Sequence, residues 1–363
     1  MATPQEKLWD RDAHTAAKHD MLVRYLAAWF PIIAKGFPSR GLTFVDAFAG
    51  PGEYKDGSEG SPLLALRQAY RSDVRATSSR IRLVFIEKRN DRYLHLVRLI
   101  EERFPAARRP ATYAIRIHPG DCRELLAPAI SEVQGWDSPL FVNLDGWGTD
   151  TPYSIVHQLG RQDHAEVLIT FARGWSMRDR HRDDDPHQLD QFYGEPNVWR
   201  RLADAGAPLE AKTALLGYYL GRITEAGFPY QLTFELIDEG GRELLLIYAT
   251  KSELGIERMK DAMWKVDPVY GQRFRDPRDE NQLTLEISEE PDLSLLKRQL
   301  LDKVVEAGSI PLSELKRYTL LETIYREPHA TTAVRQLDAE MKLSVDWRRS
   351  HEDTIVTASL FGG

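Results

Sequence analysis

The chain has 363 residues, of which 42% are hydrophobic and 28% charged, a composition typical of a globular protein long enough for two domains. The net charge of −7 gives no support to nucleic-acid binding by the chain as a whole, and the single cysteine, Cys122, excludes a disulfide framework. The single cysteine fits a reducing cytoplasm, where we expect the protein, and no apolar run approaches the ~18 residues of a membrane span.

An amphipathic helix is predicted first, over residues 15–35, because its apolar residues recur at helical spacing. Strands and helices then alternate along the chain, which predicts a mostly parallel sheet with helices on both faces. The strands are expected at Leu42–Asp46, Ile81–Glu87, Ile115–His118, Pro139–Asp145 and Ala165–Phe171. The helices between them are expected at Ser61–Tyr70, Asp91–Phe104, Arg123–Gln134 and Tyr153–Leu159.

A polar stretch, residues 173–207, interrupts this alternation and is predicted to be an insertion or lid. A helix over 209–226 follows. Two β-prone runs, Gln231–Ile237 and Leu244–Thr250, flank a turn with two glycines, which is typical of an antiparallel hairpin. A further helix is expected at Gly255–Val266.

The pattern changes near the C-terminus, after a charged, proline-containing linker at residues 271–290. Helices are expected at 293–307, 312–325 and 330–342, before a β-prone tail at Ser344–Phe361. Three helices followed by a hairpin are typical of a winged-helix module. The predicted domains are therefore a Rossmann-like domain at 1–270 and a winged-helix-like domain at 291–363.

The most informative motif is the run from Leu42 to Gly52, LTFVDAFAGPG, in which a strand ends in an acid and then in small residues and glycines. Glycine lets the backbone turn tightly and approach a ligand closely. Candidate cofactor-binding residues here are Asp46, Ala49, Gly50 and Gly52.

Acids also follow the next three strands, and ligands bind at the carboxyl ends of the strands in such sheets. The candidates are Glu87, then Asp121 with Cys122, and Asp145 with Trp147. When such a sheet binds S-adenosylmethionine, an acid after the second strand accepts hydrogen bonds from the ribose hydroxyls. An acid after the third strand accepts a hydrogen bond from the adenine amino group. We therefore predict S-adenosylmethionine as the cofactor.

The spacing does not favour a nicotinamide cofactor. That fingerprint runs its glycines straight into a helix, with the ribose acid about 20 residues further on. Here Gly52 leads into a polar loop, and Glu87 lies farther away. A phosphate-binding Gly-Lys-Ser/Thr loop is absent from the sequence, and the histidines have no paired spacing that predicts a metal site.

The motif at residues 44–52 resembles motif I of class I methyltransferases that modify nucleobases. The ordered set of motifs is similar to the three-Cys-motif partner (TcmP) family over most of residues 8–270. The further matching pieces are His14-Thr15-x-x-Lys18, Gly60-Ser61-Pro62-Leu63, Phe85-Ile86-Glu87-Lys88, Phe141-Val142-Asn143-Leu144-Asp145 and Phe192-Tyr193-Gly194. The resemblance implies a class I methyltransferase sheet ending in an antiparallel hairpin, and a three-Cys-motif protein as partner.

One motif departs from this resemblance. Methyltransferases that act on base amines place Asp/Asn-Pro-Pro-aromatic after the fourth strand, where the acid accepts the amine hydrogens and the ring stacks on the base. Here the sequence is Asp145-Gly146-Trp147-Gly148, without the stiff proline. Asp145 and Trp147 are the candidate catalytic residues, facing a DNA or RNA acceptor.

Each candidate also has a structural interpretation. Asp46 and Asp121 are good helix or turn caps, and Glu87 has cationic neighbours with which it would pair at the surface. Cys122 and Trp147 are residue types common in cores. Lys18 is expected either on a solvated helix face or at the carboxylate of the cofactor.

Two functions therefore stay open. The first is an S-adenosylmethionine-dependent methyltransferase that transfers the methyl group directly to a nucleic-acid base. The second is a non-catalytic or cofactor-sensing partner protein with the same fold, which Gly146 and the acidic charge balance favour.

Overall fold

The computed structural model describes residues 5–146, 149–171, 186–204, 206–237, 243–275, 290–347 and 354–359. The chain divides into two compact units. The N-terminal unit comprises Met1–Ser252 and Phe274–Gln282, and the C-terminal unit comprises Glu253–Arg273 and Leu283–Gly363. Among the described residues, no helix is long and apolar enough to cross a membrane.

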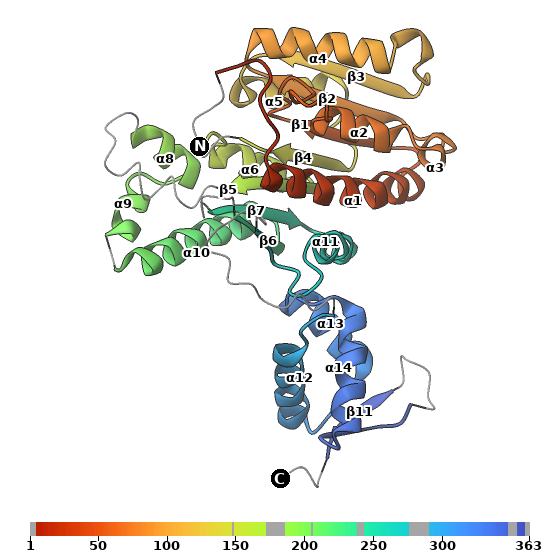
Figure 1. Cartoon of the computed structure of the whole chain (residues 1–363), viewed down its shortest axis with the longest axis vertical. Helices are drawn as coiled ribbons and strands as arrows, with labels where there is room; N and C mark the ends of the chain where they lie inside the picture. The colour runs from red at the N-terminus through yellow and green to blue at the C-terminus, as the bar shows by residue number, and fades with distance from the viewer. Residues whose placement is uncertain are drawn as a thin grey trace. The chain divides into compact units, whose positions relative to one another are not determined.

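The N-terminal unit is built on one sheet with the strand order β3-β2-β1-β4-β5-β7-β6-β8 (Figure 1). Neighbouring strands from β3 to β5 are parallel, whereas β7 is antiparallel to both β5 and β6. A parallel sheet extended by an antiparallel hairpin is the predicted class I methyltransferase arrangement, so the predicted fold class is confirmed. The strands are β1 (Leu42–Asp46), β2 (Ile81–Glu87), β3 (Tyr113–Pro119), β4 (Leu140–Leu144), β5 (Ala165–Phe171), β6 (Tyr230–Ile237), β7 (Glu243–Thr250) and β8 (Arg273–Arg275).

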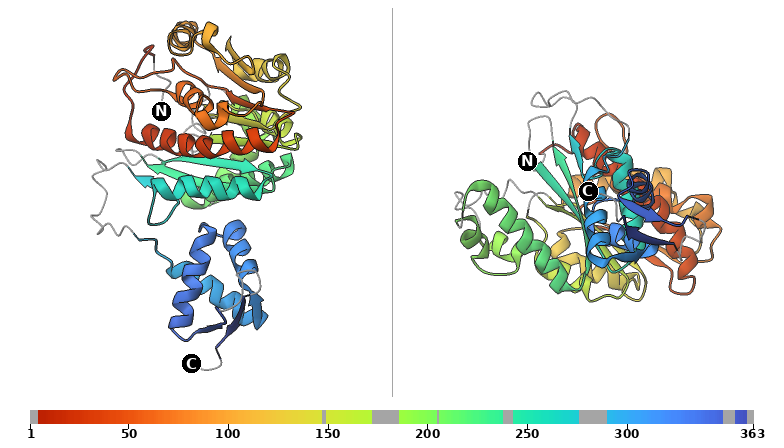
Figure 2. Two further views of the ribbon diagram at one scale, coloured as in Figure 1. Left: turned by 90° about the vertical axis from the view of Figure 1, so that its right-hand side faces the viewer. Right: turned by 90° about the horizontal axis from the view of Figure 1, so that it is seen from below.

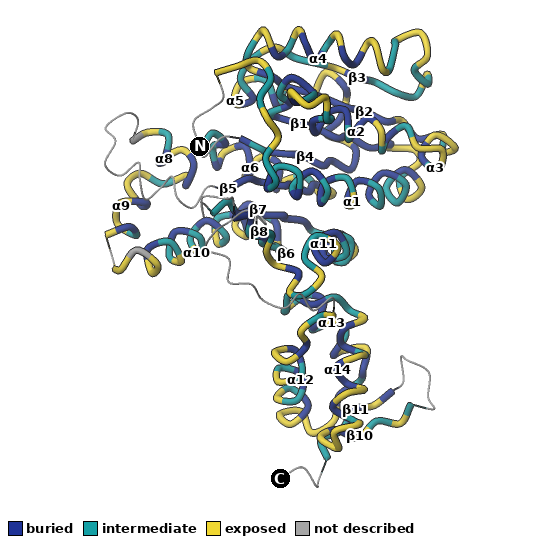
Figure 3. Tube along the Cα trace, viewed as in Figure 1, coloured by how far each residue is buried: buried dark blue, intermediate teal, exposed yellow. Residues whose placement is uncertain are grey.

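Alternate residues of each central strand enter the packing on opposite faces of the sheet. Val45 of β1 and Val142 of β4 belong to a core cluster with side chains of α5 (Cys122–Glu132), α6 (Tyr153–Gly160) and α10 (Pro208–Ala226). Phe44 and Phe141, which precede them in the same strands, stack with ring centroids 5.8 Å apart, and Tyr25 of α1 (Ala13–Gly36) lies against Phe141. Every residue of β1 and β2 is buried, which Figure 3 shows as continuous dark blue.

The helices of the N-terminal unit connect these strands. They are α1 (Ala13–Gly36), α2 (Ser61–Ala69), α3 (Ser72–Arg75), α4 (Asn90–Arg103), η1 (Ala106–Arg108), α5 (Cys122–Glu132), α6 (Tyr153–Gly160), α8 (Pro186–Tyr193), α9 (Val198–Ala203) and α10 (Pro208–Ala226). The first begins where the Asp12 side chain accepts a hydrogen bond from the Thr15 N–H. Part of the predicted 173–207 insertion, residues 173–185 and 205, lies outside the described residues.

The C-terminal unit contains α11 (Glu253–Val266), α12 (Ser294–Ala307), β9 (Ser309–Pro311), α13 (Leu312–Glu322), α14 (Glu327–Ala339), β10 (Leu343–Val345) and β11 (Ile355–Ala358). The three short strands form one antiparallel sheet in the order β10-β11-β9. Helix, strand, two helices and two strands follow each other in the winged-helix order. Figure 2 shows these helices and strands in blue from two further sides.

Helix α11 belongs to the C-terminal unit, whereas the predicted domain boundary at residue 270 placed it in the first domain. Lys260 of α11 explains this membership. Its buried ammonium lies 2.5 to 3.2 Å from four carbonyl oxygens at and beyond the C-terminal end of α13. Two of these oxygens, on Thr319 and Leu320, belong to the last turn of α13, where helix carbonyls lack a backbone N–H partner, and a cation at a helix C-terminus is favourable.

Several predicted boundaries differ from the observed ones. Strand β3 is longer than predicted because its polar residues, including Tyr113 and Arg116, hide the strand pattern while its backbone pairs with β2 along the full length. Helix α14 begins at Glu327 rather than at 330, because Pro328 is tolerated in the first turn of a helix.

Candidate functional site

A pocket of about 690 Å³ lies at the carboxyl ends of β1, β2, β3 and β4 in the N-terminal unit. Its volume is in the range of pockets that hold a nucleoside-sized ligand. Among the predicted cofactor-binding residues, those that line it are Lys18, Ala49, Gly50, Gly52, Glu87, Asp121 and Cys122. Asp145 lines it as well. Residues from five separate segments of the sequence are thus brought together.

The glycine turn after β1 has the backbone conformation that the sequence predicted. Gly50 and Gly52 have φ angles of +64° and +88°, a region that other residues adopt only with strain. A Cβ atom on Gly52 would lie 2.7 Å from Cδ1 of Leu96, whereas one on Gly50 would meet only Trp9, at 3.6 Å. Gly52 is therefore required by both packing and backbone conformation, and Gly50 by backbone conformation.

Asp46 does not line the pocket; it lies beneath the wall and is fully buried. Its Oδ1 accepts long hydrogen bonds, both of 3.3 Å, from the Phe48 N–H and from the Asn143 side chain. Burial raises the pKa of Asp46 to about 6, because the carboxylate has lost most of its hydration. By accepting the Phe48 N–H, Asp46 caps the turn that follows β1, which is the structural interpretation given above for this residue.

Glu87 connects the end of β2 to the glycine turn. Its Oε2 accepts the N–H of Gly50 at 2.8 Å, and its Oε1 accepts the N–H of Arg89 at 2.7 Å. The side chain is buried, so it does not form the surface ion pair that was the alternative interpretation. Burial raises its pKa, although these hydrogen bonds and the nearby Arg92 counteract the shift. Each carboxylate oxygen retains a second lone pair for a ligand hydroxyl.

Asp121 is the N-cap of α5, and it also lines the pocket. Its Oδ1 accepts the Arg123 N–H at 2.9 Å, while the Arg123 side chain and Lys88 form ion pairs with Oδ2 at 2.6 and 3.0 Å. The Arg123 side chain above all holds the pKa of Asp121 well below its usual range. The capping interpretation is thus correct in geometry, and it leaves Asp121 at the pocket surface. Cys122 beside it is buried, and burial raises the pKa of its thiol to about 12.

Lys18 and Asp145 form an ion pair across the pocket, from α1 to the segment after β4. Thr170 of β5 donates its hydroxyl to the other carboxylate oxygen of Asp145 at 2.6 Å. Burial disfavours the charged carboxylate, but the Lys18 ammonium and these hydrogen bonds outweigh it and lower the pKa of Asp145. Lys18 therefore does not lie on a solvated face of α1. Trp147, the other candidate catalytic residue, lies outside the described residues.

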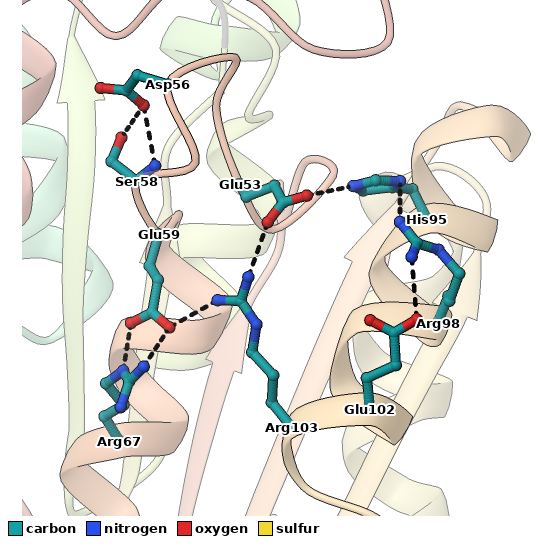
Figure 4. A network of polar contacts seen from close by, with 9 residues as sticks. All are labelled: Glu53, Asp56, Ser58, Glu59, Arg67, His95, Arg98, Glu102 and Arg103. Carbon is teal, nitrogen blue, oxygen red and sulfur yellow. Dashed lines mark hydrogen bonds and ion pairs between the residues drawn. The ribbon is translucent and has the colours of Figure 1, made fainter.

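The loop between β1 and α2 is fixed by an ionic network that includes Glu53, which lines the pocket (Figure 4). Glu53 accepts hydrogen bonds from His95 at 3.0 Å and Arg103 at 2.8 Å, both on α4. Arg103 also reaches Glu59 at 2.8 Å, and Arg67 of α2 contacts the same carboxylate. The glycine-rich loop is thus held rigidly between two helices, which favours a pre-formed pocket.

Sequence reasoning missed two aromatic residues of the pocket, Trp9 and Tyr54. Their rings meet edge to face with centroids 5.6 Å apart. It also missed His19, which lines the pocket next to Lys18 and whose pKa burial lowers to about 3, so that the ring is neutral. A lone aromatic residue or histidine outside a motif carries no spacing signal, so nothing in the sequence distinguished these three.

No model of a known protein family matches the chain, and no curated protein matches its sequence. Solved structures with a similar fold include a complex of Trm1 from Pyrococcus horikoshii with S-adenosyl-L-methionine, 13% identical over 73% of this chain, with a TM-score of 0.39. This chain spans 62% of the length of that protein.

A second similar structure is a protein from Legionella pneumophila, 13% identical over 65% of this chain and 85% of its own, with a TM-score of 0.38. A third is a geranyl diphosphate methyltransferase in complex with GPP and sinefungin, 12% identical over 62% of this chain and 78% of its own, with a TM-score of 0.24. These likenesses are too distant to carry an argument about function, which rests on the geometry of the pocket.

Proposed function

We propose that this protein is an S-adenosylmethionine-dependent methyltransferase. The observation that carries the proposal is the arrangement at three successive strand ends: a positive-φ glycine turn after β1, Glu87 after β2 and Asp121 after β3, all lining one pocket. These are the positions at which a nucleoside cofactor needs close backbone approach, an acceptor for ribose hydroxyls and an acceptor for the adenine amine.

The residues present fit such a cofactor. Glu87 is fixed by two backbone N–H groups and keeps acceptor capacity at both oxygens. The loop 53–60 separates the glycine turn from α2, which begins at Ser61. A dinucleotide site instead runs its glycines straight into the helix that binds the pyrophosphate. The geometry therefore supports a phosphate-free nucleoside.

S-adenosylmethionine supplies an electrophilic methyl group on its sulfonium. The residues of this chain would contribute positioning and exclusion of water around the acceptor. Asp145, held by Lys18 and Thr170, presents a fixed carboxylate at the end of β4. Because its pKa is lowered, Asp145 is a weak base, and we assign it to orienting an acceptor N–H rather than to removing a proton first.

We propose a nucleic-acid base as the methyl acceptor. From the sequence motifs we also propose that the chain belongs to the TcmP family and has a three-Cys-motif protein as its partner. A base amine would use the Asp145 carboxylate as its hydrogen-bond acceptor. The C-terminal unit has the winged-helix order, an architecture that includes DNA-binding modules.

Isothermal titration with S-adenosylmethionine and S-adenosylhomocysteine tests cofactor binding directly. We expect both to bind, and radiolabelled methyl transfer to RNA or DNA then tests the acceptor. Absence of binding by both ligands at high concentration contradicts the proposal. If both ligands bind but no methyl group is transferred to RNA or DNA, the proposed cofactor site stands and the proposed nucleic-acid acceptor is contradicted.

The second candidate is a cofactor-binding partner protein without chemistry, and one observation favours it. The Lys18–Asp145 ion pair occupies the carboxylate that an acceptor would need, and Gly146 replaces the proline that stiffens this position in similar chains. Methyl transfer that disappears in Asp145→Asn, with cofactor binding retained, would decide against this candidate.

A further inference from the structure

Residues 5–12, which we call the N-terminal clasp, form part of the pocket wall. The clasp runs from beside the start of α4 to the start of α1, as the dark red trace in Figure 1 shows. Trp9 and Asp12 within it line the pocket. No motif drew attention to this segment, and the proposed chemistry does not use it.

Two arginines at the junction of β2 and α4 hold one end of the clasp. Arg89 donates to the carbonyl oxygen of Gln5 at 2.6 Å, and Arg92 donates to that of Glu6 at 2.9 Å. Arg89 also donates its backbone N–H to Glu87. The clasp is therefore linked, through one residue, to the carboxylate assigned to the ribose hydroxyls.

The loop that follows the glycine turn also holds the clasp, through contacts of Lys55 with Trp9 and Glu6. The Lys55 N–H donates to the carbonyl oxygen of Trp9 at 3.1 Å, and the Lys55 ammonium pairs with Glu6 at 2.5 Å. The side chains of Lys55 and Glu6 are 44% and 63% exposed, and such surface pairs contribute little stability. The clasp contains no helix or strand and is held by individual hydrogen bonds and exposed ion pairs, so it opens without disrupting the core of the unit.

The Trp9 ring is held between Arg92 and Tyr54. The Arg92 guanidinium lies 4.5 Å from the ring centroid, and the Tyr54 ring meets Trp9 edge to face. The far edge of the indole reaches to 3.6 Å from the position of a Cβ on Gly50. This large apolar side chain therefore stands against the turn at which the backbone comes closest to a bound nucleoside.

We propose that Trp9 is a cofactor-binding residue, and that the N-terminal clasp closes over the bound nucleoside cofactor at the glycine turn. This inference rests on the proposed function. The clasp opens to let the cofactor pass, and in its closed position Trp9 excludes water from the ligand while Arg89 and Arg92 fix the clasp to the ribose side of the pocket. Closure slows dissociation more than it affects association.

The first test measures S-adenosylhomocysteine dissociation from the full chain by stopped flow. We expect Trp9→Ala and Arg92→Met each to raise the dissociation rate at least about tenfold, since a tenfold change corresponds to the ~1.4 kcal/mol expected for losing one such contact. Arg116→Met is the matched control. It lies on β3, pairs with Glu132 on the exposed surface and does not line the pocket, so its rate should be unchanged.

The second test follows hydrogen exchange in residues 5–12 and does not depend on activity. S-adenosylhomocysteine should slow exchange of the clasp in the wild-type chain and in Arg116→Met, and much less in Arg92→Met. Circular dichroism and thermal melting check that each variant is folded.

The outcomes separate the two proposals. If the wild-type chain fails to bind S-adenosylhomocysteine, both the proposed function and the clasp are overturned. If it binds, but the dissociation rates of Trp9→Ala and Arg92→Met match the wild type and ligand leaves exchange of residues 5–12 unaltered, the clasp alone is overturned.

Discussion

The Glu87 carboxylate accepts the backbone N–H of Gly50 at 2.8 Å, which ties the end of β2 to the turn after β1. One acid therefore has two tasks. It fixes the glycine turn in its positive-φ conformation, and it presents lone pairs to the pocket. This relationship makes the shape of the cofactor pocket depend on a side chain that a sequence pattern assigns only to ligand contact.

Replacing Glu87 with Gln tests this double task. Glutamine retains one carbonyl oxygen for the backbone but loses the charge and one acceptor, so affinity for S-adenosylhomocysteine should fall by about 1–3 kcal/mol. Isothermal titration measures the loss. Glu225→Gln, on the exposed surface of α10, is the control and should bind as the wild type does. Unchanged affinity in a folded Glu87→Gln protein would assign Glu87 a structural role only.

A glycine series separates backbone strain from lack of space. Gly57 has φ +78° and no atom near the position of a Cβ, so Gly57→Ala should cost only the strain of about 1–2 kcal/mol. Gly52→Ala should cost more, because its Cβ would come within 2.7 Å of Leu96.

Gly50→Ala should resemble Gly57→Ala in stability, and Gly50→Val should abolish cofactor binding because the larger side chain enters the space beside Trp9. Urea unfolding and ligand titration measure the two effects. A Gly52→Ala protein as stable as Gly57→Ala would show that Leu96 moves aside at little cost.

The Lys18–Asp145 pair should show strong coupling in a double-mutant cycle. Lys18→Met leaves a carboxylate with little exposure and no cation, and breaking such a pair costs on the order of 3–5 kcal/mol when it is fully buried. The side chains are 15% and 19% exposed, so we expect the lower end of this range. Lys18→Met with Asp145→Asn should recover most of the loss. Additive losses, measured by urea unfolding, would contradict the coupling.

Glu166 should make stability fall as the pH rises. Burial raises its pKa from 4.5 to about 7, and Tyr25 and Tyr248 are hydrogen-bonded to the same carboxyl group. The folded protein therefore binds this proton more tightly than the unfolded chain. Its stabilising contribution is complete below pH 4.5 and is lost as the pH rises through about 7.

Glu166→Gln removes this proton, so the difference in unfolding free energy between the variant and the wild type should change across that pH window. Thermal or urea unfolding at pH 4.5 to 8 measures the difference. A constant difference over the whole window would mean that Glu166 titrates normally in the folded protein.

The sequence by itself determined the central strands. The structure has β1, β2 and β5 with the predicted bounds, Leu42–Asp46, Ile81–Glu87 and Ala165–Phe171. Each is buried along its whole length and is mostly apolar, with only one or two charged residues, so its sequence marks it clearly. Because parallel strands bring their carboxyl ends to one edge, the sequence also determined that Gly50, Glu87 and Asp121 would meet at one pocket.

Only the tertiary structure decided which partner each polar side chain takes. Lys18 meets Asp145 across 127 positions of sequence, and Trp9 meets Arg92 through a segment without regular structure. Asp46 lies beneath the pocket wall although its motif position suggested the surface. Strand pattern fixes where a residue lies along the sheet, whereas the direction and partner of its side chain depend on elements distant in sequence that fold against it.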